Sequence, residues 1–338
     1  MTDNTSTAVA YGTPQIAARE GKLGYLPVAL FGSVMGLAGL SSAWRLAGQL
    51  YQLPQWIAPL FGFLALLAFV LVAAAYAVKA VTAPHAVKVE FLHPIAGNLF
   101  GTVFISLLLL PIALADYSLM LARGSWVIGA VGMLGFAWVI MSRWLSQRQQ
   151  AAHATPAWIV PVVGLTDIPL AMPLLHWNGL GDIGFFALAV GLFFAIPLFT
   201  LIFSRLLFEE PIGVGLQPSL LILLAPFAVG FSAYVSLTGE VDRFASALYM
   251  LALAIAQAVI ALSGHARVAV GWCAGFVTFA VIAWLSSNDL YLRVELALVA
   301  SSLVSLAIFV VSLKQKMSGD AVFDDASIID ALAERPLE

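Results

Sequence analysis

The sequence predicts an all-α integral membrane protein with ten transmembrane helices. Its composition is 62% hydrophobic and only 10% charged, whereas soluble domains carry roughly 25% charged residues. The mean hydropathy is +1.00. A soluble core cannot enclose this much apolar surface, so lipid is expected to be the solvent for most of the chain. Apolar segments long enough to cross a bilayer, and basic residues that gather on one side of them, support the same prediction.

The ten segments follow from length and hydropathy, since a spanning helix needs roughly 20 mostly apolar residues. They are 25–47, 56–82, 98–116, 124–146, 157–177, 183–207, 217–238, 242–263, 265–287 and 292–314. The longest connection runs from Thr82 to Gly97 and mixes charged and apolar residues. It predicts either an interfacial helix or a simple connecting loop, and the loop is the more common case.

Basic residues are distributed unequally between the two sides of these segments. Of the 15 lysines and arginines, eleven lie on the side of the N-terminus and four (Arg45, Arg123, Arg243 and Arg293) lie on the other. The positive-inside rule then predicts that both termini are cytoplasmic, which requires an even number of helices.

The expected domain organisation is simple. Residues 1–22 form a cytoplasmic N-terminal tail without the charged-then-apolar order of a signal peptide, 23–316 form the transmembrane domain, and 317–338 form an acidic cytoplasmic C-terminal tail. No segment accommodates a nucleotide-binding domain, so transport by this chain is expected to be passive or ion-coupled.

Several function classes are disfavoured by composition. A net charge of −3 argues against a nucleic-acid partner. The single cysteine, Cys273, cannot form a disulfide or thiolate metal site within one chain. The five histidines fall in loops or at helix ends, where they cannot serve as paired haem ligands. We therefore expect no cofactor, no metal site and no enzymatic activity.

The ten segments pair into five hairpins, and the first helix of each pair carries glycine, proline or small polar residues near its middle. Such residues mark either close helix packing or backbone that lines a cavity. Their recurrence in all five odd-numbered helices favours a shared path lined by these helices. The candidate pore-lining residues are Gly36, Ser106, Pro111, Gly164, Thr166, Asp167, Pro226, Gly230, Gly275 and Thr278.

The chemistry of this path fits a weakly bound anion. Its odd-numbered helices carry almost no basic residue in their middle thirds, which favours rapid passage. A dicarboxylate carrier is expected to use a buried arginine or lysine to hold each carboxylate. We expect hydroxyls to donate hydrogen bonds to the anion instead, and these are Ser33, Thr102, Ser106, Thr166, Ser232 and Thr278.

Asp167 does not fit this simple picture. It falls near the centre of the fifth segment, and an intramembrane carboxyl is a functional hypothesis by default. Three interpretations stay open. It is protonated or hydrogen-bonded at a kink near Pro169, it pairs with a basic residue of another helix or subunit, or it couples transport to protons or sets selectivity.

Four segments together resemble the tellurite-resistance/dicarboxylate transporter family, which includes bacterial TehA proteins and plant slow-type anion channels. They are 27–40 (PVALFGSVMGLAGL), 93–101 (HPIAGNLFG), 156–164 (PAWIVPVVG) and 225–234 (APFAVGFSAY). The resemblance spans roughly residues 23–314. It implies five helical hairpins in a quasi-fivefold arrangement around a central pore, a homotrimer, and a location in the bacterial inner membrane.

The family also implies a gating phenylalanine in the ninth helix. Within 275–280 (GFVTFA), Phe279 matches best, by the hydroxyl residue before it and the small residue after it. Phe276 is the alternative, and packing against lipid or protein is the ordinary role for either residue.

Three functions are therefore weighed. The first is passive or gated transport of chloride, nitrate or a similar small anion across the lipid bilayer. The second is a proton-coupled carrier of C4-dicarboxylates such as malate, or an exporter of tellurite or another toxic anion. The third is a membrane scaffold that transports nothing.

Overall fold

The computed structural model describes residues 23–177, 179–209, 212 and 214–263, together with 274–279, 281–282, 296–297, 299–301, 303–304 and 307. The chain divides into two compact units, Met1–Leu253 and Ala254–Glu338. The expected tails, 1–22 and 317–338, lie outside the described residues. Most of the ninth and tenth expected spans does so as well.

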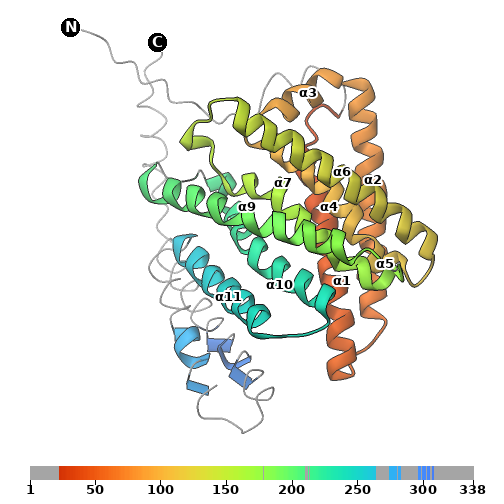
Figure 1. Cartoon of the computed structure of the whole chain (residues 1–338), viewed down its shortest axis with the longest axis vertical. Helices are drawn as coiled ribbons and strands as arrows, with labels where there is room; N and C mark the ends of the chain where they lie inside the picture. The colour runs from red at the N-terminus through yellow and green to blue at the C-terminus, as the bar shows by residue number, and fades with distance from the viewer. Residues whose placement is uncertain are drawn as a thin grey trace, which may run out of the picture. The chain divides into compact units, whose positions relative to one another are not determined.

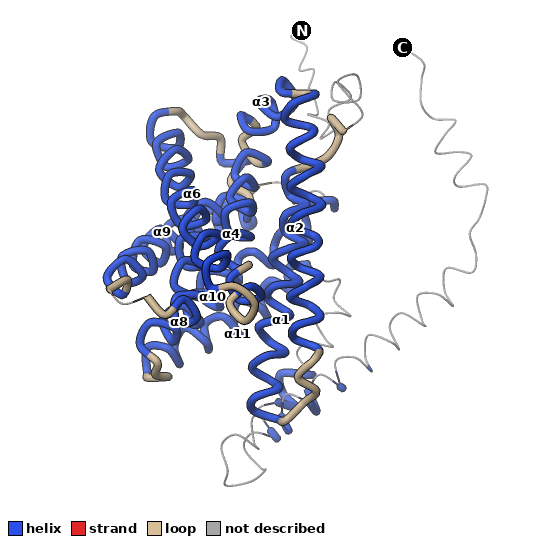
Figure 2. Tube along the Cα trace, turned by 90° about the vertical axis from the view of Figure 1, so that its right-hand side faces the viewer, coloured by secondary structure: helices blue, strands red, loops and turns tan. Residues whose placement is uncertain are grey.

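The described part of the first unit is built from helices joined by short loops, and it contains no strand (Figures 1 and 2). The 3-10 helices are η2 (Val28–Phe31), η3 (Ala96–Phe100), η4 (Ala151–His153), η5 (Pro156–Ile159), η6 (Gly164–Ala171) and η7 (Val214–Leu224). The α-helices are α1 (Gly32–Tyr51), α2 (Ile57–Thr82), α3 (Pro84–Leu92), α4 (Gly101–Leu109), α5 (Pro111–Leu114), α6 (Leu119–Ser146), α7 (Val160–Val163), α8 (Met172–Leu175), α9 (Gly181–Phe208), α10 (Ala225–Thr238) and α11 (Arg243–Ser263), the last of which continues into the second unit.

Among the described residues, six helical segments are long and apolar enough to cross a membrane. They are Ile57–Thr82, Ala96–Leu114, Leu119–Ser146, Pro156–Leu175, Gly181–Phe208 and Ser219–Thr238. Helices also cover most of the expected first and eighth spans, at residues 28–51 and 243–263. The helical membrane-protein class is therefore confirmed, while the total of ten spans stays a prediction.

Four segments of the first unit pack one against the next, and we call them the inner elements. They are 28–51 (η2 and α1), 96–114 (η3, α4 and α5), 156–175 (η5, α7, η6 and α8) and 214–238 (η7 and α10). Helix α1 contacts α4, α4 contacts η6, and η6 contacts α10. They correspond to the first, third, fifth and seventh expected spans, so these odd-numbered segments are neighbours in space.

The helices between them, α2, α6 and α9, form the outer helices. Each packs across consecutive inner elements: α2 contacts α1 and α5, α6 contacts α4 and η6, and α9 contacts η6 and α10. Figure 2 shows α1 and α2 side by side as the first such pair. The hairpins predicted from the sequence are therefore arranged as an inner row with an outer layer.

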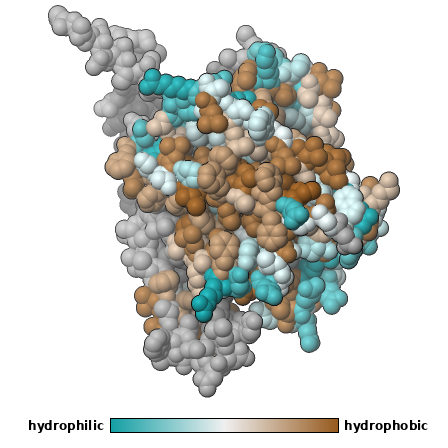
Figure 3. Space-filling model, in the orientation of Figure 1, coloured by the Kyte–Doolittle hydropathy of each residue, from teal (hydrophilic) through white to brown (hydrophobic). Residues whose placement is uncertain are grey.

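Burial separates the outer helices from the two middle inner elements. Within the most apolar stretch of each segment, 72% of Ala96–Leu114 and 78% of Pro156–Leu175 is buried, against 17% of α2, 39% of α6 and 33% of α9. Hydrophobic residues cover the middle of the face seen in Figure 3, and hydrophilic residues gather towards its edges. This surface suits lipid, because the outer helices expose apolar side chains.

The backbone of the inner elements is irregular. Each begins with a 3-10 helix, and 156–175 changes between 3-10 and α-helix three times. Prolines at 156, 161, 169 and 173 explain this, because proline removes an N–H donor and clashes with the preceding turn. The Ile168 carbonyl of this segment accepts a hydrogen bond of 2.8 Å from the Trp126 indole Nε1–H of α6. A side chain of an outer helix thus donates directly to the backbone of the kinked inner element.

Candidate functional site

The hydroxyls expected to serve an anion already donate to backbone carbonyls. Ser33 donates to Leu30, Thr102 to Leu99 and Thr166 to Val163, each over 2.6–2.7 Å. Ser106 donates to Thr102 at 2.7 Å, and Ser232 and Thr278 donate four residues back. Local bonds of this kind satisfy carbonyls of an irregular backbone. Each hydroxyl must therefore rotate away from its carbonyl before it can donate to an anion, which the sequence did not reveal.

Asp167 lies on η6 and is 6% exposed. No hydrogen bond or ion pair joins its carboxyl to any residue that the structure describes. Its element packs against α4, α6, α9 and α10, so the carboxyl is enclosed by several helices. An ionised carboxylate in such a place lacks a compensating charge and is costly. Of the three interpretations, pairing with a basic residue within the described chain is not observed.

The candidate glycines and prolines occupy different surroundings. A Cβ added to Gly36 on α1 would meet nothing within 4 Å, whereas at Gly164 it would lie 2.5 Å from the Met133 methyl of α6. At Gly230 it would lie 3.0 Å from Leu192 of α9. Pro111 and Pro226 are buried near the first positions of α5 and α10. Gly36 thus faces open space, while Gly164 and Gly230 permit close packing, and their role in lining a path stays a prediction.

The predicted gate belongs to the second unit. Phe276, Thr278 and Phe279 lie with Gly275 on one helical segment, 274–279. The Thr278 hydroxyl donates to the Ala274 carbonyl at 2.8 Å. The helical conformation expected for this stretch is present, and the choice between the two phenylalanines stays a prediction.

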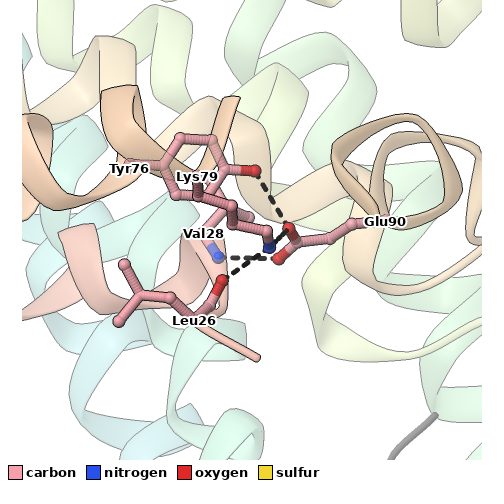
Figure 4. Close-up of polar contacts among 5 residues, drawn as sticks. All are labelled: Leu26, Val28, Tyr76, Lys79 and Glu90. Carbon is pink, nitrogen blue, oxygen red and sulfur yellow. Dashed lines mark hydrogen bonds and ion pairs between the residues drawn. The ribbon is translucent and has the colours of Figure 1, made fainter. Parts of the chain in front are cut away.

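A buried ion pair joins α3 to α2 and to the start of the first inner element (Figure 4). The Lys79 ammonium lies 2.6 Å from Glu90 Oε2 and also donates to the Leu26 carbonyl at 2.6 Å. Glu90 accepts further bonds from the Tyr76 hydroxyl and the Val28 N–H, at 2.9 and 2.7 Å. The side chains of Lys79 and Glu90 are only 3% and 13% exposed. We call these five residues the Lys79 network.

The other end of α3 is held by α6. The Arg143 guanidinium donates to the Phe91 carbonyl at 3.0 Å and lies over the Phe91 ring at 4.8 Å. After α3, the His93 Nδ1 accepts from the N–H groups of Ile95 and Ala96, which begin the next inner element. Partial burial lowers the pKa of His93, and nearby His153 lowers it further. The segment between Thr82 and Gly97 therefore contains a helix, α3, whose two ends are held by neighbouring side chains. Of the two structures expected for this segment, the simple connecting loop is wrong.

The four inner elements contain a single basic side chain, Arg45, among their described residues. Its guanidinium donates to Asp116 Oδ2 at 2.7 Å and to the Ile112 carbonyl at 3.1 Å. Arg123 of α6 is similarly engaged, because its guanidinium donates to the carbonyls of Leu175 and His176. No described inner element therefore presents a free guanidinium for a carboxylate substrate.

Comparison with known families decides the class of this structure. Residues 25–317 match the SLAC1 family of voltage-dependent anion channels. The chain belongs to the SLAC1 family.

Relatives within the SLAC1 family are distant in sequence. The S-type anion channel SLAH3 of Arabidopsis thaliana is 26% identical over 235 residues, which cover 67% of this chain and 36% of that protein. The tellurite resistance protein TehA homolog of Haemophilus influenzae is 26% identical over 230 residues, covering 66% and 68%. An uncharacterised transporter of Methanocaldococcus jannaschii is 26% identical over 220 residues, covering 62% and 64%. The matched region therefore spans slightly less than two thirds of that archaeal relative, and 46% of a second one.

These SLAC1-family relatives confirm the resemblance inferred from the four sequence motifs. They are named as channels, transporters or a resistance protein, in agreement with a membrane transport protein that is not an enzyme. The family match and the apolar helices together establish the chain as a membrane protein of an anion-channel and transporter family.

Sequence reasoning missed two polar features of this SLAC1-family fold. Lys79 and Glu90 were counted only as charges flanking a span, although their eleven-residue separation across a break at Pro84 allows them to meet. Arg205 was likewise counted only as a basic residue at a helix end. In the structure it is 8% exposed, and its Nε and Nη1 atoms have no hydrogen-bond partner among the described residues.

Proposed function

We propose that the chain conducts chloride, nitrate or a similar small monovalent anion across the bacterial inner membrane, through a path lined by the odd-numbered helices. The observation that carries this proposal is the lack of a free basic side chain in the described inner elements. A tight carboxylate-binding site needs such a group, whereas conduction needs weak binding. The SLAC1 family match supports the choice of an anion.

The complete architecture belongs to the same proposal. Ten helices form five hairpins in a quasi-fivefold arrangement, both termini are cytoplasmic, and three copies assemble, each with its own pore. The row of four inner elements, each packed on the next, supports this arrangement. In the proposed pore, Phe279 of the ninth helix closes the path, and Phe276 is the alternative gate.

The test is anion flux into liposomes that contain the purified protein. Phe279→Ala is expected to raise chloride and nitrate flux several-fold, because the smaller side chain no longer fills the path. Phe276→Ala is the matched control and is expected to leave flux unchanged. Increased flux for Phe276→Ala alone moves the gate to that residue, and unchanged flux for both variants overturns the gate. The absence of flux in every protein, with correct folding, favours a scaffold.

A second candidate is a proton-coupled carrier of C4-dicarboxylates or an exporter of a toxic oxyanion such as tellurite. The carboxyl of Asp167, which is buried and has no partner among the described residues, favours it, since intramembrane carboxyls commonly relay protons. Flux of chloride, nitrate, sulfate and malate at two pH values separates the candidates. A carrier shows saturating, pH-driven malate uptake that Asp167→Asn abolishes. A channel shows chloride flux whose pH dependence Asp167→Asn leaves unchanged.

A further inference from the structure

Arg205 is a buried cation with no hydrogen-bond or ion-pair partner among the residues that the structure describes. It lies in the last turn of α9 and is 8% exposed. Its Nε and Nη1 atoms are enclosed and have no hydrogen-bond partner among the described residues. Glu209 lies one turn further along the chain, yet it forms no ion pair with Arg205 in the described structure. Enclosing an arginine without an acceptor is costly, so this geometry points to an acceptor that the described residues do not supply.

Thr155 is a second enclosed group of the same kind. Its side chain is 3% exposed, and its Oγ1 atom has no hydrogen-bond partner among the described residues. It lies between η4 and η5 and precedes Pro156, the first residue of the third inner element. Its hydroxyl does not cap η5, in contrast to Ser118, which caps α6. The usual local use of such a hydroxyl is therefore absent.

The packing of α9 brings these two groups to the same end of the first unit. A Cβ on Gly184 would approach Met172, and one on Gly191 would approach Thr166, so α9 runs antiparallel to the segment 156–175. Continuing along α9 towards Arg205 leads back past η5 to η4. Both of these turns contact α9. The last turn of α9, which carries Arg205, is therefore directed towards the two turns that flank Thr155.

We propose that Arg205 and Thr155 bind a small inorganic anion at this end of the helix bundle, beside the start of the third inner element. Guanidinium N–H groups and a hydroxyl are donors that suit a halide or a small oxyanion. The enclosed atoms favour a compact ligand over a lipid headgroup, which needs an open face. The choice of chloride or nitrate rests on the proposed function. The site gives an anion a fixed positive charge that is not already paired, which the described inner elements lack.

The test measures thermal unfolding of the purified full-length chain in detergent, with chloride or nitrate replacing gluconate at constant ionic strength. A ligand that binds only the folded state raises the melting temperature as its concentration passes the dissociation constant. Arg205→Gln is expected to weaken the apparent anion affinity about tenfold or more, because it removes a charged donor. Thr155→Val removes a neutral donor and is expected to weaken it about threefold to tenfold.

Arg148→Gln is the matched control, because it removes an exposed arginine that lies two residues beyond the end of α6. It is expected to keep the full anion-dependent shift. Equal shifts in the wild type, Arg205→Gln and Thr155→Val overturn the proposal. A shift produced by phosphatidylglycerol and not by chloride also overturns it and assigns the groups to a lipid. If Arg205→Gln does not fold, Thr155→Val decides, because it keeps the charge.

These outcomes are independent of the liposome flux measurement. Normal flux with an unchanged melting shift in both variants removes this site and leaves the proposed function intact. An anion-dependent shift that Arg205→Gln abolishes, in a protein that shows no flux, supports the site and removes the conduction proposal.

Discussion

The inner element Pro156–Leu175 and the outer helix α2 are both apolar spans of the same unit, yet they differ in almost every structural respect. Helix α2 is one unbroken helix of 26 residues, and only 17% of its most apolar stretch is buried. Pro156–Leu175 has 20 residues in four helical pieces, and 78% of its most apolar stretch is buried. The surroundings of α2 suit lipid, whereas those of Pro156–Leu175 are mostly other parts of the protein.

The difference shows where irregular backbone is tolerated in a membrane. A helix facing lipid must satisfy its backbone hydrogen bonds within itself, and α2 does so without interruption. In an inner element, side chains of neighbouring helices can donate hydrogen bonds to backbone carbonyls, as Trp126 does to the Ile168 carbonyl. Kinks, polar groups and a buried carboxyl are therefore concentrated in the inner elements, where a path is proposed. Three pairs of substitutions test this contrast.

The largest expected effect comes from breaking the Lys79 network, which joins α2 to the inner element at 28–51. Lys79→Met leaves the Glu90 carboxylate without its cation and is expected to cost about 3–5 kcal/mol of unfolding free energy. Lys88→Met on the exposed face of α3 is the control and is expected to change it by less than about 0.5 kcal/mol. Thermal or denaturant unfolding in detergent measures both. Equal stability of the two variants contradicts a structural role for the network.

The next effect compares the same truncation in the two regions. Leu165 on η6 is 1% exposed, and Leu71 on α2 is 60% exposed. Leu165→Ala is expected to cost about 2–5 kcal/mol, because it leaves a cavity in packed protein. Leu71→Ala removes a contact with lipid or detergent and leaves no cavity, so its cost in the same unfolding measurement is expected to be much smaller. A cost at Leu71 as large as that at Leu165 refutes the assignment of inner and outer layers.

The smallest effect concerns the bond that supports the kink. Trp126→Phe removes the indole N–H that donates to the Ile168 carbonyl, and we expect a loss of about 1–3 kcal/mol of unfolding free energy. Trp138 lies on the same helix α6 and is 72% exposed, so Trp138→Phe provides a matched control with an expected change of less than about 0.5 kcal/mol. Near-ultraviolet circular dichroism reports whether the surroundings of the inner element change as well. If Trp126→Phe changes neither the unfolding free energy nor the circular dichroism spectrum, the Ile168 carbonyl does not need this donor.

Hydropathy predicted the outer helices closely and the inner elements less well. The second span was expected at 56–82, and α2 runs from Ile57 to Thr82. The agreement is close because an unbroken apolar run of this length predicts a single spanning helix. The fourth was expected from residue 124, yet α6 begins at Leu119, where the Ser118 hydroxyl accepts from the Leu121 N–H. Prolines predicted a perturbed fifth span, although hydropathy could not show that it consists of four pieces.

The candidate site was predicted only in part, because the missing information is tertiary. Nothing in the sequence shows that Glu90 meets the Val28 N–H across 62 residues. The hydroxyl residues lie in helical segments of the expected odd-numbered spans, but the sequence did not show that three of them donate three residues back and the other three donate four residues back. The position of Asp167 within an apolar span was predicted from its neighbours in the sequence, whereas the absence of a partner for its carboxyl among the described residues could be seen only in the structure.

The Lys79 network also has a consequence for how the chain is made. The ends of the first two helices are joined through Glu90, which is synthesised after both of them. A ribosome that has released α1 and α2 into the membrane still holds back the residue that neutralises the Lys79 ammonium. The first hairpin therefore enters the bilayer with an unpaired charge near one end, and its assembly is completed only when α3 emerges. Insertion and final folding of this hairpin are separate events in time.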